Sequence, residues 1–228
     1  MRHLPLLSIL FFSVLAIEIA ADTYGYNSIG YVLKPLLMPI LMLLFWLNGA
    51  KYSIKEKALF TAALTFSLAG DILLMFRTKE LFVFGLGAFL VAHLCYITFF
   101  WGDIKKAKPG INSLLLGLLP FVIFVGGFLS VLYPNLMAKP EAQSLVAPIT
   151  AYACILGTMG LFALLRRKAV TPTGFQLVFL GALIFITSDS CIALNTFVSP
   201  IPQPTLLIMA TYGIAQYMIT LGVLKSRE

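Results

Sequence analysis

Charged residues, histidines and cysteines are all scarce in this sequence. Only 11% of its 228 residues are Asp, Glu, Lys or Arg, whereas soluble domains usually carry about 25%. The two histidines, His3 and His93, form no cysteine–histidine spacing typical of a metal site, so we expect neither a bound metal nor a cofactor. All three cysteines, Cys95, Cys154 and Cys191, fall within apolar runs, and no disulfide framework is predicted.

Hydrophobic residues, by contrast, make up 60% of the chain and gather into eight long runs. A helix needs about 20 mainly apolar residues to cross the hydrocarbon core of a bilayer. Backbone groups in lipid must bond within their own segment, which favours helices over open strands. We therefore predict an all-α, polytopic membrane helix bundle with about eight transmembrane helices and a single domain over residues 1–228. The predicted spans are Leu4–Ala21, Leu33–Leu47, Ala58–Phe76, Leu81–Phe100, Ile111–Leu132, Leu145–Leu165, Phe175–Phe197 and Thr205–Leu224.

Two of these spans have uncertain limits. The second is short, and an earlier start near Ser28 is the alternative to Leu33. The first follows Arg2 and resembles a signal peptide, but it contains Glu18. Cleavage after Ala20 would put Glu18 at the minus-three position, where a small residue is expected. We therefore expect the first span to be retained.

Basic residues set the expected orientation. The net charge of +7 comes from clusters in the short connections between apolar runs, a pattern typical of cytoplasmic loops rather than of nucleic-acid binding. With the N-terminus inside, twelve Lys and Arg residues fall on the cytoplasmic side and four on the other. This predicts N-in and C-in, in the inner membrane if the chain is bacterial. Gly70-Asp71 and Ser188-Asp189 lie four spans apart, and we interpret them as either a weak 4+4 repeat or chance.

Three acidic residues, Glu18, Asp71 and Asp189, lie within predicted spans. Asp22 lies at a span boundary, and we place the remaining acids in loops or at the end: Glu56, Glu80, Asp103, Glu141 and Glu228. An ionisable group inside the bilayer is costly unless it faces the bundle interior or water. At 1.5 Å per residue, Asp71 and Asp189 lie about 8 Å and about 12 Å from the outer ends of their spans. We expect them to share a cavity, the alternative being a structural clamp between helices.

Other polar residues fall in the same band of depth. Lys34 starts an inward-running span, His93 and Tyr96 are three residues apart on one helical face, and Tyr212 and Gln216 are four apart on another. Each has a structural alternative: Lys34 as an interfacial anchor, and His93 as a hydrogen bond between helices.

Several short motifs together resemble the YhhN-like lysoplasmalogenase family. In chain order they are Lys34-Pro35, Gly70-Asp71-Ile-Leu-Leu-Met, Ala92-His93-Leu-Cys-Tyr96, Ser188-Asp189 and Tyr212-x3-Gln216. The resemblance covers the whole chain. It implies an eight-span membrane hydrolase whose substrate is a lysophospholipid. Its reaction cleaves the vinyl ether bond of lysoplasmalogens to a fatty aldehyde and glycerophospho-ethanolamine or -choline.

Two intramembrane aspartates suit that chemistry. Vinyl ether hydrolysis needs one protonated carboxyl, which a low-dielectric site favours, and a second carboxylate that stabilises the cation and activates water. We assign these roles to Asp71 and Asp189, expected about 5–9 Å apart by analogy with paired-carboxylate glycosidases. Lys34 is expected to hold the lipid phosphate. The expected orienting residues are His93, Tyr96, Ser188, Tyr212 and Gln216.

Two other function classes remain as alternatives. Buried Asp and His residues are also used in proton relays. A proton-coupled lipid or small-molecule transporter or flippase is therefore the second interpretation. A non-catalytic membrane assembly factor is the third interpretation.

Overall fold

The computed structural model describes residues 3–76 and 78–228, together with all side chains in these ranges except those of Asn27 and Lys79; Arg2 and Arg77, counted above for orientation, lie outside it. Within the described residues there is no strand, and eight helical segments are long and apolar enough to cross a membrane. The prediction of an all-α, eight-span, multi-pass membrane protein is confirmed. The spans are Leu4–Thr23, Ser28–Asn48, Ile54–Met75, Glu80–Ala107, Ile111–Met137, Pro140–Lys168, Pro172–Val198 and Pro204–Lys225.

The second span is built from three pieces: α2 (Asn27–Leu33), a 3₁₀ turn (Lys34–Leu36) and α3 (Leu37–Asn48). Pro35 supplies no backbone N–H, and the chain tightens into 3₁₀ geometry where that donor is missing. The span begins at Ser28, as the earlier of the two predicted starts had it. Lys34 therefore lies inside the span, and the expectation that it opens the span is wrong.

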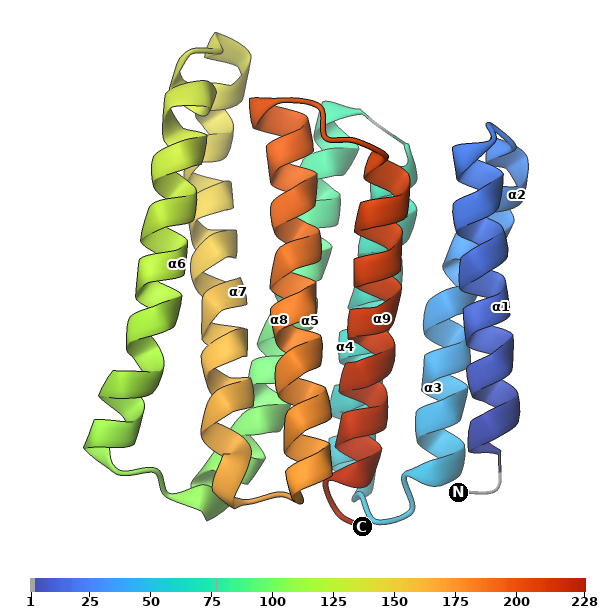
Figure 1. The fold of residues 1–228 in the computed structure, drawn as a ribbon, viewed down its shortest axis with the longest axis vertical. Coiled ribbons are helices and arrows are strands. Elements are labelled where there is room, and N and C mark those ends of the chain that lie inside the picture. The colour runs from blue at the N-terminus through green and yellow to red at the C-terminus, as the bar shows by residue number, and fades with distance from the viewer. Residues whose placement is uncertain (1–2, 77) are drawn as a thin grey trace.

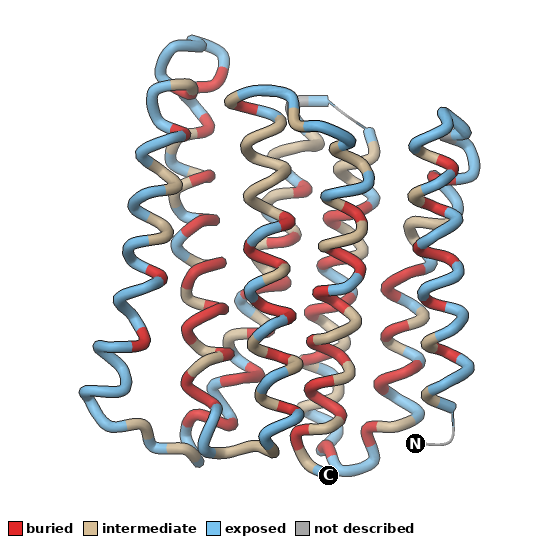
Figure 2. The backbone as a smooth tube through the Cα atoms, in the orientation of Figure 1, coloured by how far each residue is buried: buried red, intermediate tan, exposed pale blue. Residues whose placement is uncertain are grey.

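The helices form one bundle whose two termini lie at the same end (Figure 1). We call the opposite end the outer end, after the N-in and C-in orientation that the sequence predicts. In this view α8 (Pro172–Ala193) and α9 (Pro204–Lys225) stand in front of α4 (Ile54–Met75) and α5 (Lys79–Ala107). At one edge of this view lies α6 (Ile111–Met137), which is mostly exposed in Figure 2, as a lipid-facing helix would be. At the other edge lies α1 (Leu4–Thr23), along which buried and exposed residues alternate. The sixth span, which contains α7 (Val146–Leu165), and α9 are the most buried spans.

Close contact between α8 and α9 depends on glycine. A Cβ atom added at Gly222 would lie 2.7 Å from the Val178 backbone nitrogen, and one added at Gly181 would lie 3.0 Å from the Ala215 carbonyl oxygen. Small residues let membrane helices approach this closely. Across the same interface the Ser188 hydroxyl donates to the Ile208 carbonyl over 3.1 Å. This interface fixes the two helices that carry Asp189 and Tyr212.

At the end that holds the termini, Asp103 lies inside α5 and is only 4% exposed, so its predicted place in a loop is wrong. Arg166 is fully buried and donates to the Asp103 carboxylate and to the Ser226 hydroxyl, each over 2.8 Å. The guanidinium neutralises the carboxylate, which lets α5 stay helical to Ala107, beyond its predicted end at Phe100. We call Asp103, Arg166 and Ser226 the inner cluster.

Candidate active site

The carboxylate of Asp71 is enclosed near the outer half of α4. Its side chain is 3% exposed, and Oδ2 accepts a hydrogen bond from the Tyr212 hydroxyl of α9 over 2.7 Å. A Cβ atom at Gly70 would lie 2.5 Å from the Phe89 ring, so only glycine leaves room for that ring. The Phe89 ring in turn meets the Tyr212 ring edge-on, with centroids 5.9 Å apart. The Gly70-Asp71 pair therefore combines a space for an aromatic ring with a carboxylate held by a tyrosine.

A second tyrosine holds the carboxylate of Asp189 on α8. The Tyr152 hydroxyl of α7 donates to Asp189 Oδ2 over 2.5 Å. His93 Nε2 of α5 lies 3.0 Å from the Tyr152 hydroxyl and 3.5 Å from the same Asp189 oxygen. Since the single tyrosine proton goes to Asp189, the network assigns a proton to His93 Nε2, which donates to the Tyr152 oxygen. His93 thus supports Tyr152, and Tyr152 holds Asp189.

The sequence did not single out Tyr152. It lies in the middle of the predicted run Leu145–Leu165, where it counts as one more large apolar side chain. The available signal was its hydroxyl, because a buried tyrosine usually places its O–H against a partner. Nothing in the run itself identifies Asp189, 37 residues further on, as that partner.

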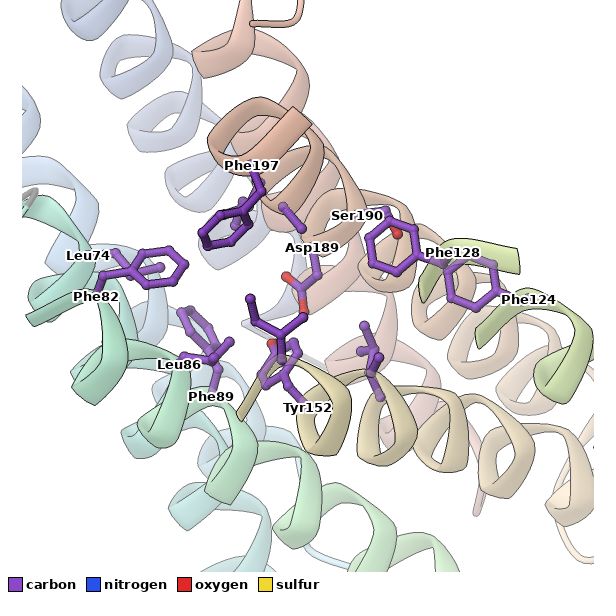
Figure 3. Close-up of a pocket in the computed structure, with 15 residues that line it drawn as sticks. Leu74, Phe82, Leu86, Phe89, Phe124, Phe128, Tyr152, Asp189, Ser190 and Phe197 are labelled. Atoms are coloured by element: carbon purple, nitrogen blue, oxygen red, sulfur yellow. The ribbon is translucent and has the colours of Figure 1, made fainter. Parts of the chain in front are cut away.

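Asp189 lines a narrow apolar pocket of about 50 Å³, shown in Figure 3. Its carboxylate lies among aromatic and aliphatic side chains from α4, α5, α6, α7 and α8, with the Tyr152 ring beside it. The apolar lining residues are Leu74, Phe82, Leu86, Phe89, Phe124, Phe128, Ile149, Ala153, Leu156, Ile192, Ala193 and Phe197. A Phe- and Leu-rich lining of this kind suits an acyl chain, and we call this space the apolar pocket.

A larger cavity of about 880 Å³ adjoins the apolar pocket at the outer end. The two share the lining residues Leu74, Phe82, Ile192 and Phe197. Unlike the apolar pocket, this cavity carries ionisable groups of both signs: Glu18, Asp22, Lys34, Lys139 and Glu141. We call it the charged cavity. Together the two spaces form a site with one apolar end and one ionic end.

Asp71 lines neither of these two spaces, so within the described residues they do not unite both carboxylates as the sequence suggested. Aromatic contacts connect the two aspartates instead. The Phe185 ring packs against the Tyr212 ring, 5.6 Å between centroids, and against the His93 ring, 4.9 Å. Asp189 is therefore the carboxylate that faces the apolar pocket, and Asp71 lies behind the aromatic side chains.

Three of the predicted orienting residues contact protein groups instead. Tyr96 donates to Gln216 Oε1 over 2.6 Å, and Gln216 Nε2 donates to the Ser67 hydroxyl over 3.0 Å. These bonds tie α4, α5 and α9 together one turn from Tyr212 and Asp71. Ser188 bonds the α9 backbone. Lys34 is different: it lines the charged cavity, and its charge acts on both Asp71 and Glu18.

The sequence model of the YhhN family matches residues 29–223. The chain belongs to the YhhN family. Among its relatives, a lysoplasmalogenase TMEM86B of Sus scrofa is 34% identical over 189 residues, covering 83% of this chain and 74% of the relative. A lysoplasmalogenase TMEM86A of Bos taurus is 35% identical over 168 residues, covering 72% and 65%. A lysoplasmalogenase of Mycobacterium tuberculosis is 33% identical over 175 residues, covering 76% and 63%. No solved structure matches this YhhN-family chain.

Proposed function

We propose that this YhhN-family chain is a membrane hydrolase that cleaves the vinyl ether bond of lysoplasmalogen-type lysolipids. Three relatives from mammals and a bacterium carry the name lysoplasmalogenase. The observation that carries the proposal is a carboxyl group, Asp189, on the wall of an apolar pocket that shares lining residues with a charged cavity. A single-chain lipid has the matching form, an apolar tail joined to an ionic head group.

The reaction begins with protonation of carbon. An acid transfers its proton to the alkene carbon that is not bonded to oxygen, and the other alkene carbon becomes part of an oxocarbenium ion. Water adds to that second carbon and loses a proton to a base. The resulting hemiacetal breaks its bond to the glycerol oxygen, which takes up a proton and leaves as an alcohol. The products are a fatty aldehyde and a glycerophospho-base, and the net co-reactant is one water molecule.

Asp189 is the acid in this scheme. It faces the apolar pocket, where the vinyl ether and the first carbons of the chain fit while the rest of the tail lies against Phe124 and Phe128 of the peripheral helix α6. Oδ2 is held by Tyr152, so Oδ1 is the oxygen that delivers the proton. Once deprotonated, the same carboxylate takes the proton of the attacking water, the acid-to-base switch of retaining glycosidases.

Asp71 supplies the second negative charge. Tyr212 holds it behind Phe89 and Phe185, where its charge stabilises the oxocarbenium ion through space. A fixed dipole or charge in a water-poor site acts more strongly than it would in water. Asp71 is thus an electrostatic positioning residue in this scheme, and Asp189 is the catalytic one. Lys34, on the wall of the charged cavity, holds the lipid phosphate.

Purified protein in detergent tests the proposal when it is given three lysolipids that differ only at carbon 1 of glycerol. The 1-alkenyl lipid is expected to lose its chain as aldehyde, while the saturated 1-alkyl and the 1-acyl lipids stay intact. Cleavage of the acyl lipid alone would identify an esterase instead. Transbilayer movement of unchanged 1-alkenyl lipid in protein-containing vesicles, with no aldehyde, would favour the transporter alternative.

A further inference from the structure

Glu18 is a buried carboxylate that the proposed chemistry leaves unused. It lies on α1, is only 3% exposed, and lines the charged cavity. Its Oε2 atom has no hydrogen-bond partner among the described residues. A carboxylate removed from water without a partner is strongly destabilised. A group in this state is suited to receive a hydrogen-bond donor from outside the chain.

The groups around Glu18 carry both signs of charge. Asp22 lies one turn further along α1, on the same wall of the cavity, and its Oδ2 accepts a bond from the Thr205 hydroxyl over 2.8 Å. Lys34 acts electrostatically on Glu18, yet no ion pair within 4.0 Å joins the two in the described chain. Lys139 also lines the cavity, and its amino group donates to the Phe197 carbonyl over 3.4 Å. An acidic and a basic group thus line one cavity without neutralising each other directly.

We propose that Glu18 receives the ammonium group of the substrate's head group, while Lys34 and Lys139 hold the phosphate. The phosphate and ammonium of a zwitterionic head group lie two carbons apart, so its recognition requires adjacent groups of opposite charge. The charged cavity supplies them. The chain is then selective for lysolipids whose head group ends in an ammonium ion over those that end in glycerol. This inference rests on the proposed function and names the determinant of its head-group selectivity.

The direct test compares two 1-alkenyl lysolipids, one with an ethanolamine and one with a glycerol head group. The wild-type protein is expected to show the higher kcat/KM for the ethanolamine lipid. The variant Glu18→Gln keeps the shape of the side chain but loses its charge. We expect it to reduce the ratio of the two kcat/KM values by about 10-fold or more, the range of a charge-assisted hydrogen bond. The exposed residue Glu80 lines neither space, and Glu80→Gln is the matched control that should leave this ratio unchanged.

If Glu18→Gln does not fold, lipid binding to the wild-type protein provides a second test of head-group selectivity. Saturated 1-alkyl lysolipids with the same two head groups cannot be cleaved, and their binding to wild-type protein is read from the shift in unfolding temperature. The ethanolamine lipid is expected to bind about 10-fold or more tightly. Equal binding of the two lipids, or an unchanged kcat/KM ratio in Glu18→Gln, would overturn the inference. Absence of aldehyde with every lipid would instead overturn the proposed function, while the binding ratio of the two lipids would still decide whether the protein prefers the ammonium head group.

Discussion

The two ends of the bundle hold the aspartates within helices in opposite ways. In the inner cluster, Arg166 donates to Asp103 over 2.8 Å, and Arg227 lies 3.9 Å from its other carboxylate oxygen. In the outer half, Asp71 and Asp189 accept bonds from neutral tyrosine hydroxyls. No Lys or Arg among the described residues lies within 4.0 Å of either. His93, at 3.5 Å from Asp189, is the nearest basic side chain recorded there.

This difference separates a structural carboxylate from a reactive one. A carboxylate beside a guanidinium is held in its ionised form and contributes mainly to the architecture. A carboxylate held by hydroxyl groups, with an apolar pocket in front of it, can exchange a proton with a bound molecule. Asp71 and Asp103 are both buried acids within helices, so burial alone does not distinguish the two kinds; the partner and the neighbouring space do.

The largest effect is expected from Asp189→Asn. Removal of the proton donor should lower kcat for aldehyde release by about 10²–10⁴-fold, the usual contribution of general acid–base catalysis. The unfolding temperature should change little, because the amide is isosteric and still accepts from Tyr152. Asp103→Asn is the comparison variant, expected to lose stability rather than catalysis in the folded fraction. Equal activity of Asp189→Asn and wild type would show that Asp189 is not the proton donor.

Arg166→Met is the complementary change at the inner end. It removes the closer of the two guanidinium groups and leaves buried Asp103 with Arg227 at 3.9 Å. Breaking a buried ion pair in this way costs about 3–5 kcal/mol of unfolding free energy. Denaturant unfolding in detergent measures the loss. The double variant Arg166→Met/Asp103→Leu removes both charges and should recover much of the stability. A double variant no more stable than the single one would show that Asp103 is not the source of the cost.

Two tyrosines offer a smaller, matched test. Tyr152→Phe removes the donor to Asp189 and should lower kcat about 10-fold, because the negative charge that forms on Asp189 as it transfers its proton loses one hydrogen bond. At the other end Tyr52 donates to the Val223 carbonyl over 2.5 Å, and burial raises the pKa of its hydroxyl. Tyr52→Phe should cost about 1–3 kcal/mol of stability, because a buried carbonyl loses its partner. Impaired catalysis at full stability in Tyr52→Phe, with normal catalysis in Tyr152→Phe, would contradict the assignment of Tyr152 to catalysis and of Tyr52 to stability.

The smallest effect is expected at the chain end. Lys225 and Glu228 form a partly exposed ion pair at 3.0 Å. Exposed pairs contribute about 0–1 kcal/mol, so Glu228→Gln should leave both the unfolding free energy and aldehyde release nearly unchanged. A loss as large as that of Arg166→Met would mean that the inner cluster extends to the terminus.

Span number and helical class follow from the apolar runs because the bilayer requires a helix of defined length. Rotation of the helices about their axes does not follow in the same way. The positions of Asp71 and Asp189 in their runs predict similar depth, yet only Asp189 faces the apolar pocket. The packing of Phe89 on Gly70 and of Phe185 on Tyr212 determines which way each carboxylate faces. Neither contact can be predicted from the spacing of residues within one span.

The same limit explains the residues that sequence reasoning misplaced. Asp103 and Arg166 each look like loop residues, since charged positions at the ends of apolar runs usually meet water or head groups. Their mutual contact, 63 positions apart in sequence, allows both to be buried. The predicted apolar run begins at Leu33, which puts Lys34 at the start of the span. The structure adds the seven residues of α2 (Asn27–Leu33), about two turns of helix, before it, and the lysine lines the charged cavity instead.

Proton transfer from Asp189 to carbon is the central step of the proposed reaction, and isotope incorporation tests it most directly. Wild-type protein and Asp189→Asn are incubated with 1-alkenyl lysolipid in D₂O, and the released aldehyde is analysed by mass spectrometry. Wild-type protein is expected to yield aldehyde with a single deuterium on the carbon next to the carbonyl. Its rate of aldehyde release is expected to be at least about 100-fold above that of Asp189→Asn. Aldehyde without deuterium at that carbon, or equal deuterated product from both proteins, would contradict this proton transfer.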